Sequence, residues 1–200
     1  MSSIKLKHSG GNGVIIAAPS SNPASDRTLT LPGDADGTIL TSNSALGKVL
    51  QVVNSLSSTA LTISATTTYT DTGITDAITT TAANSTILVL GSMAYDTARN
   101  NNDCGARFRI IRTISSSSSA FMESTSDRNV GFYDGDSSNH SRSYGQYPIN
   151  FHDSGLSNIA SGTTITYKMQ ARTENTNLSE DVRINFGAKF STLILMEIGA

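Results

Sequence analysis

The sequence predicts an all-β fold, an antiparallel, jelly-roll-like β-sandwich, and three observations lead to this prediction. Thr, Ser, Asn and Gly are abundant, and Thr favours strands whereas the other three favour turns. Charged residues make up only 15% of the chain and the net charge is -2, a balance unlike that of disordered proteins. No stretch has the 3.6-residue period of a helix. We therefore expect short strands joined by turns, with little helix.

Residues 1–46 are predicted to form an extended N-terminal arm. Short apolar pieces at 4–6, 14–16, 29–31 and 38–40 alternate with clusters of Gly, Pro, Ser and Asn. Strands this short are below the usual length and bury too little surface to offset the entropy lost on ordering. We expect another part of an assembly, its own trimer or a neighbouring protein, to hold this arm in place as an anchor.

Residues 47–200 are predicted to form the head domain. About eight strands are expected, at 49–53, 61–63, 74–80, 85–93, 106–110, 163–172, 182–186 and 190–198. We interpret Thr72 and Gly73 as a turn, residues 115–119 as a polar loop tip, and residues 123–153 as a long turn-rich segment. The last strand is so apolar that it would aggregate if left free, so we expect it in the middle of a sheet or in an interface.

Two of these strands carry apolar residues on both sides, at 87–90 and at 193–196. Both of their faces therefore need cover. The opposite sheet would cover one face and a neighbouring subunit the other. Closed cyclic symmetry would provide that neighbour without open-ended growth, and it would also protect sheet edges.

Several classes of partner and location are not expected from the composition. There is no long run of Lys and Arg, so nucleic acid is not an expected partner. No segment approaches the ~20 apolar residues of a membrane span, so we expect no membrane insertion. Residues 1–18 lack the features of a signal peptide, which predicts synthesis in the cytoplasm. Cys104, interpreted as part of a Gly/Asn loop, has no partner for a disulfide or a redox motif.

No cofactor or metal site is expected. The loop Gly10–Gly13 lacks the strand, helix and Lys of phosphate-binding loops. His8, His140 and His152 share no metal-ligand spacing. Residues 134–139 are rich in oxygen ligands and could suit calcium, but they lack the Gly and Glu of an EF-hand, so a solvated hairpin tip is preferred.

No catalytic site is expected either, so the chain is not predicted to be an enzyme. Glu123 with Asp127, or Glu180 with Asp181, could be proposed as acid pairs. Each pair is predicted to lie in a loop, where acidic side chains are normally just solvated. A glycan-cleaving enzyme therefore remains an alternative without an assigned acid pair.

The candidate receptor-contact residues lie in the turn-rich segment. They are Arg128, Tyr133, His140, Arg142, Tyr144 and Tyr147. Such side chains can stack on sugar rings and hydrogen-bond to hydroxyls, and loops on a rigid scaffold often carry recognition. Alternatively, the tyrosines pack the segment onto its own scaffold or into a trimer interface. Arg107, Arg109 and Arg112 could line a subunit contact with acidic partners.

Several segments resemble a family of small virion proteins of marine and cyanobacterial phages, the tail-fibre or receptor-binding proteins. The matching segments of the head are 47–53, 68–74, 84–90, 108–112, 164–168 and 193–198, and those of the arm are 29–33 and 36–40. The resemblance covers most of the chain and rests on strand and turn patterns. It implies a homotrimeric β-sandwich head on a short stem, with no catalytic residues to transfer.

The resemblance leads us to expect a virion protein, a trimeric fibre or fibre-like appendage. Its arm would contact other virion proteins and its head would bind host surface polysaccharide. Two alternatives stay open. The chain could be a capsid-attached decoration or fibre protein without receptor binding, or a stand-alone carbohydrate-binding module that acts as a monomer.

Overall fold

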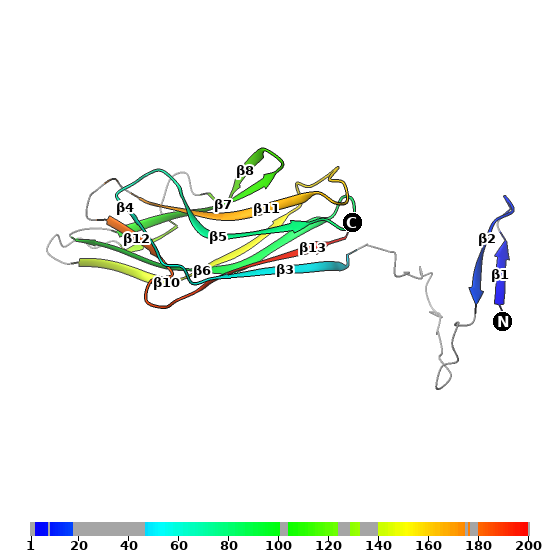
Figure 1. The fold of residues 1–200 in the computed structure, drawn as a ribbon, viewed down its shortest axis with the longest axis horizontal. Coiled ribbons are helices and arrows are strands. Elements are labelled where there is room, and N and C mark those ends of the chain that lie inside the picture. Colours follow the sequence, from blue (N-terminus) through cyan, green and yellow to red (C-terminus); the bar gives the residue numbers. More distant parts are fainter. Residues whose placement is uncertain are drawn as a thin grey trace, which may run out of the picture. The chain divides into compact units, whose positions relative to one another are not determined.

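The computed structural model describes residues 3–7, 9–17, 47–100, 104–123, 129–132, 140–174, 176 and 180–199. The chain divides into two compact units, Met1–Thr41 and Ser42–Ala200. Every regular element in the described ranges is a β-strand, and each pairing is antiparallel (Figure 1). The predicted all-β, antiparallel sandwich is therefore confirmed.

The first unit contains a β-hairpin made of β1 (Ser3–Lys7) and β2 (Gly13–Ala17). In this hairpin Ile4 lies opposite Ile16 and Leu6 opposite Val14. Two of the predicted short arm strands, 4–6 and 14–16, are thus strands. The other two, 29–31 and 38–40, lie outside the described residues.

The second unit contains a six-stranded sheet. Its strands are β3 (Val49–Ser57), β4 (Leu61–Ser64), β6 (Thr86–Asn100), β10 (His140–Asp153), β12 (Glu180–Ile184) and β13 (Ser191–Ile198). The long β6 is central, because β10 pairs along one edge of it. On its other edge, β13 pairs with the first half of β6 and β12 with the second half. The strand β13 lies between β3 and β6, as its apolar sequence predicted.

A five-stranded sheet packs against the first one. Its strands are β5 (Thr70–Thr79), β7 (Cys104–Ile114), β8 (Ser117–Phe121), β9 (Val130–Phe132) and β11 (Thr164–Thr173). β11 pairs with β5 on one side and β7 on the other, and β8 and β9 both pair with the far edge of β7.

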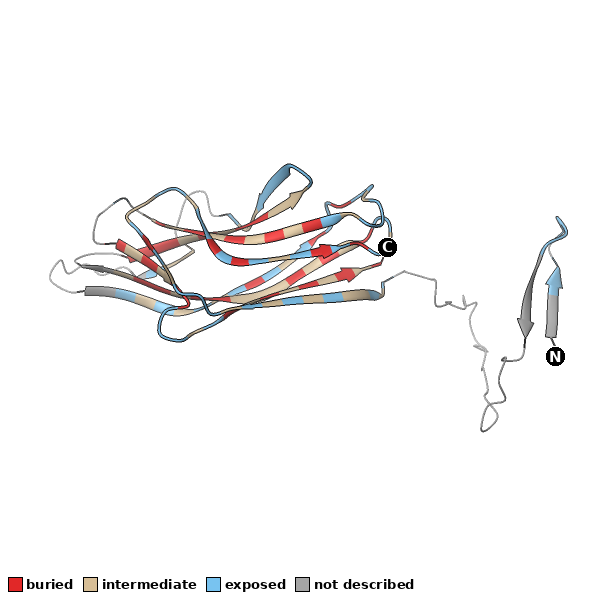
Figure 2. Ribbon diagram, in the orientation of Figure 1, coloured by how far each residue is buried: buried red, intermediate tan, exposed pale blue. Residues whose placement is uncertain are grey.

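The core lies between the two sheets. Buried and less buried residues alternate along β11 and β13, as the colours in Figure 2 show. Leu193 and Leu195 of β13 point inward, as do Ile165 and Met169 of β11, and all four are buried. Each buried apolar side chain contributes roughly 1.5–3 kcal/mol relative to an exposed one, so this alternation fixes which face of each strand is turned to the core.

One predicted turn is wrong, and one predicted loop tip is too long. Thr72 and Gly73 do not reverse the chain but form a bulge within β5, where the register shifts opposite Met169. Gly73 has a φ of +78°, which glycine adopts without strain, and the Thr72 hydroxyl donates to the Met169 carbonyl at 2.9 Å. The predicted loop tip at 115–119 is shorter than expected, because β8 already begins at Ser117.

The segment 123–153 is also not the long loop that was predicted. Its second part is β10, a strand of 14 residues. Cys104 is likewise not in a loop. It is the first residue of β7, fully buried, and its thiol lies 3.6 Å from the Thr97 carbonyl. The described part of the head has eleven strands, β3 to β13, rather than about eight.

Candidate binding surface on the six-stranded sheet

The outer face of the six-stranded sheet carries two of the candidate residues, Arg142 and Tyr144. Along β10, Arg142 and Tyr144 point outward and Tyr147 and Ile149 point toward the core, since side chains alternate along a strand. Of the other candidates, Arg128 and Tyr133 lie outside the described residues, and for His140 only the backbone, at the start of β10, is described.

Tyr147 packs against the scaffold, which corrects its assignment as a receptor contact. Its ring lies 5.0 Å from that of Phe108, at an angle of 58°. Its hydroxyl accepts a hydrogen bond from the Asn129 amide at 3.4 Å. Burial raises the pKa of the Tyr147 hydroxyl, in spite of the opposing hydrogen bond from Asn129. For this tyrosine the packing alternative is therefore the correct one.

Tyr144 is the most exposed aromatic residue of this face, with 65% of its surface accessible. Two cations flank its ring. The Arg142 guanidinium carbon lies 5.6 Å from the ring centroid and the Lys189 amine lies 4.9 Å from it. Such cation–π contacts hold the two cations over the ring.

A buried carboxylate fixes the position of Arg142. Asp96 of β6 is only 1% exposed, and it accepts two hydrogen bonds from the Arg142 guanidinium. The Nε–Oδ1 distance is 2.8 Å, and Nη2 pairs with Oδ2. A two-point contact of this kind restricts the orientation of a planar guanidinium. Arg142 is thereby held at the surface in a defined position.

The strand β12 and the loop that follows it extend this surface. Arg183 lies directly opposite Asp96, which in turn lies opposite Tyr144. The guanidinium of Arg183 lies 5.0 Å from the ring centroid of Phe186, which is 44% exposed. We call Arg142, Tyr144, Arg183, Phe186 and Lys189 the aromatic–basic cluster.

Sequence reasoning found only Arg142 and Tyr144 of this cluster. The other three members lie about forty residues further along the chain, and the pairing of β6 with both β10 and β12 brings the two segments together. One signal was present in the sequence: the loop 185–190 places Phe, Lys and Phe close together. Phe190 is 54% exposed, and its carbonyl accepts a hydrogen bond from Gln146 of β10 at 3.4 Å.

The other half of the same outer face is apolar. Cross-strand rows join Val52, Met196 and Leu88 in one line, and Ile194 and Leu90 in the next. Leu56 extends the surface along β3. We call these six residues the apolar face. This half lies at the end where the chain enters the sheet, because the Gly47 amide donates to the Gly199 carbonyl at 3.0 Å.

The outer face of the five-stranded sheet is different, because it carries paired charges. Arg109 pairs with Glu123 at 3.3 Å, Lys168 with Asp71 at 2.9 Å, and Arg107 with Glu174 at 4.0 Å. The third arginine of β7, Arg112, points inward and pairs with Asp153 of the opposite sheet at 2.8 Å. These arginines have acidic partners in their own chain, so a subunit contact is not needed to neutralise them.

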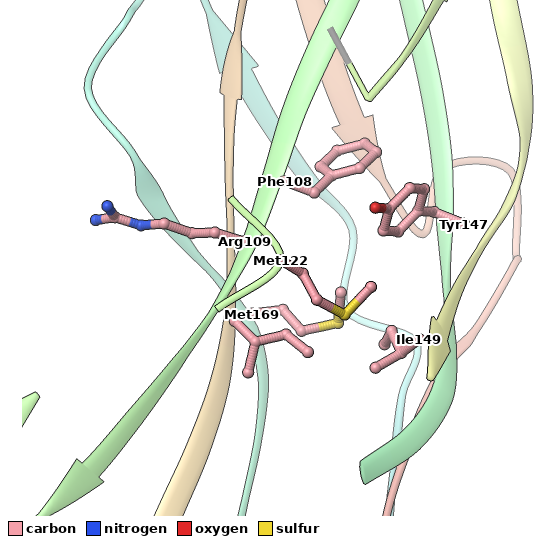
Figure 3. Close-up of a pocket in the computed structure, with 7 residues that line it drawn as sticks. Phe108, Arg109, Met122, Tyr147, Ile149 and Met169 are labelled. Atoms are coloured by element: carbon pink, nitrogen blue, oxygen red, sulfur yellow. The ribbon is translucent and has the colours of Figure 1, made fainter. Parts of the chain in front are cut away.

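A gap between the sheets is lined by Phe108, Arg109, Ile110, Met122, Tyr147, Ile149 and Met169. Figure 3 shows the sulfur atoms of Met122 and Met169 close together near Ile149, with Arg109 extending away. The gap is too narrow to admit a water molecule. It is therefore a space between packed side chains and not a ligand site.

The predicted acidic pairs have structural partners. Glu180 is buried and accepts a hydrogen bond from the Gly105 amide at 2.9 Å. Asp181 accepts one from the Ser64 hydroxyl, and Glu123 pairs with Arg109. Asp127 lies outside the described residues, as do residues 134–139.

The described part of the chain contains neither a cluster of metal ligands nor a membrane-spanning helix. Within the described ranges no three His, Cys, Asp or Glu residues are grouped as a metal site. His152 instead lies with its Nε2 atom 3.0 Å from the Thr86 hydroxyl. In the same ranges no helix is long and apolar enough to cross a membrane.

No family model matches this chain, and no curated protein does. Among solved structures it is similar to infectious bursal disease virus, Gx strain, with 9% identity and a TM-score of 0.36 over 83% of this chain and 43% of the other. It is also similar to the D431N mutant VP2 protein of the same virus, with 11% identity and a TM-score of 0.28 over 83% of this chain and 41% of the other. For the Gt strain the identity is 13% and the TM-score is 0.22, over 95% of this chain and 46% of the other. The chain spans less than half the length of these proteins, and such TM-scores are too low to indicate a shared fold.

Proposed function

We propose that the chain is a non-catalytic virion structural protein, the subunit of a trimeric fibre or fibre-like appendage, whose head binds a saccharide on the host surface. Residues 47–200 form the head. Residues 1–46 anchor it to other virion proteins. The resemblance to phage fibre proteins supports the setting. The ion pair of Glu123 with Arg109 and the hydrogen bond of Glu180 with the Gly105 amide support a non-catalytic role.

One observation carries the binding role: Tyr144 lies on the strand β10, is 65% exposed, and is flanked by Arg142 of the same strand and by Lys189 of the loop after β12. An exposed aromatic ring offers a flat apolar surface to a sugar ring, while neighbouring cations donate hydrogen bonds to hydroxyl or acidic substituents. Because Asp96 fixes Arg142, little side-chain entropy would be lost on binding.

The experiment is binding of the full chain to an array of neutral and acidic oligosaccharides, followed by titration of the best ligand. Tyr144→Ala should weaken binding about tenfold or more, as expected of a central aromatic contact. Lys189→Ala should weaken binding of acidic saccharides more than of neutral ones.

Tyr69→Ala is the matched control. Tyr69 also lies against two arginines, Arg109 at 4.0 Å and Arg172 at 5.2 Å, but it is only partly exposed. The control should bind like the unchanged protein. If no saccharide binds, the receptor role is wrong and the decoration protein without receptor binding replaces it. A solution mass of one chain together with saccharide binding would favour the stand-alone module instead.

A further inference from the structure

We propose that the apolar face of the six-stranded sheet is the surface through which copies of this chain assemble. The proposal rests on the proposed trimer and names its contact surface, with a second copy of the chain as the occupant. In the assembly the same face of each copy would turn toward a common axis, which leaves the aromatic–basic cluster at the other end of the sheet open to ligand.

The first reason for this proposal is that the side chains of the apolar face are exposed. Val52 is 52% exposed and Leu56 is 65% exposed, and both point outward from β3. Leu88, Leu90, Ile194 and Met196 lie beside them in the neighbouring strands and are partly exposed. Contiguous apolar surface of this kind usually marks an interaction site.

The second reason for this proposal is that the outer faces of the two sheets differ in charge. The five-stranded sheet covers its outer face with ion pairs such as Lys168 with Asp71. That face is suited to water. The outer rows of the six-stranded sheet from Val52 to Leu56 contain no Lys, Arg, Asp or Glu. A sheet face without charges in an otherwise solvated head indicates that protein covers it.

The chemistry of the face favours a second copy as that protein. When a face without charges meets its own copy, no like charges are brought together. The polar residues in and beside it are Asn54, Asn150, Ser92, Thr192 and the exposed His152, whose amides, hydroxyls and imidazole can donate and accept. They can therefore pair across a symmetric contact. Contacts between identical subunits are more apolar and poorer in charge than those between different proteins.

The size of the apolar face sets how much of a subunit contact it can supply. Four strands spaced ~4.8 Å apart, with about six residues of ~3.3 Å along each, span roughly 19 by 20 Å. This flat area is about half of the ~800 Å2 per partner of a standard interface, so the apolar face would form the centre of a larger contact.

The test is the solution mass of the full chain by light scattering. The unchanged protein should have the mass of three chains. Val52→Asp and Leu56→Asp should each raise the concentration at which the assembly dissociates by about tenfold or more. Both side chains are more than half exposed on the edge strand β3, so the substitutions should leave the fold intact. Circular dichroism checks this.

Two control variants place the same change elsewhere. Phe190→Asp replaces an equally exposed apolar residue outside the apolar face, and Ala77→Asp changes an exposed residue of the five-stranded sheet. Both should keep three chains. If the folded Val52→Asp and Leu56→Asp variants keep the mass of three chains, the assigned face is wrong although the trimer is correct. If the unchanged protein has the mass of a single chain, both the trimer and the assigned face are wrong. Saccharide binding is measured in a separate experiment, so the binding role is tested independently.

Discussion

Tyr167 of β11 donates its phenolic hydrogen to the Asp153 carboxylate of β10 at 2.7 Å, which joins the two sheets inside the head. Arg112 of β7 pairs with the same carboxylate at 2.8 Å. Burial first, and the bond to Asp153 second, raise the pKa of the Tyr167 hydroxyl. A buried carboxylate requires such partners, because an unpaired one is costly in a low-dielectric interior.

Tyr167→Phe should therefore destabilise the protein. It removes one donor from buried Asp153, and the expected loss is about 1–3 kcal/mol in the free energy of unfolding. Urea denaturation measures it. Tyr69→Phe is the matched control, because no partner for the buried Tyr69 hydroxyl is found within the described part of the chain. An equal loss in both variants would contradict the role given to the Tyr167–Asp153 bond.

Gly91→Ala should destabilise the head as well. A Cβ atom at Gly91 would lie 2.2 Å from the carbonyl oxygen of Thr192, so β6 and β13 would have to separate locally. We expect a loss of about 1–3 kcal/mol, typical of overpacking, measured by thermal or urea unfolding. Gly145→Ala in β10 is the control, since its nearest neighbour is a Tyr95 side-chain atom at 3.4 Å. Equal stability of the two variants would be evidence against this close approach.

Glu197 should make the protein sensitive to acid. Burial raises the pKa of this carboxyl, but hydrogen bonds from Gln51, Thr81 and Ala82 outweigh burial and hold the pKa below its usual value of 4.5. Its ionised form is therefore the stabilising one. That contribution is fully present above pH 4.5 and is lost as the pH falls through the lower pKa of the folded state.

The measurement is the unfolding free energy between pH 7 and pH 3 for the unchanged protein and for Glu197→Gln. The variant should be less stable near neutral pH, and its stability should change less on acidification. Asp181→Asn is a control, because Asp181 is a partly exposed carboxylate. Identical pH profiles for Glu197→Gln and the unchanged protein would show that another carboxylate is responsible.

Asp96 and Arg142 should be energetically coupled. Arg142→Ala leaves the buried Asp96 carboxylate without its two-point partner, whereas Arg142→Ala combined with Asp96→Asn removes the buried charge too. The double variant should therefore be more stable than the single one. A double-mutant cycle measured by urea denaturation gives the coupling, and additive effects would contradict it.

The strand β10 is the clearest case in which sequence patterns misled. Gly131, Gly135 and Gly145 are turn signals, and they led to the prediction of a long turn-rich segment. Among the described strands β10 pairs with β6 alone, so it is an edge strand, and it contains Pro148. A proline that donates no hydrogen bond is tolerated at such an edge. Whether a strand lies at the edge or in the centre of a sheet depends on how all the strands pair, so the sequence of the strand alone does not reveal it.

The turn predicted at Thr72 and Gly73 failed for a related reason. A glycine with positive φ serves a turn and a bulge equally well, and only the pairing of β5 with β11 decides between them. The central position of β13 was predicted because eight residues with apolar character on both faces cannot be left exposed.

The sequence by itself therefore determined the class of fold and the position of most strands along the chain, and it limited β13 to the middle of a sheet or an interface, because these follow from alternation and from the need to bury apolar residues. The tertiary structure decided which tyrosine is available to a ligand and what lies beside it. Tyr144 and Tyr147 are three residues apart, yet one is exposed and the other packs on Phe108. That difference comes from the register of β10 on β6, which also brings Arg142 onto Asp96 and Tyr144 next to Lys189. Register is set by pairing between distant segments, so it exists only once the sheet has formed.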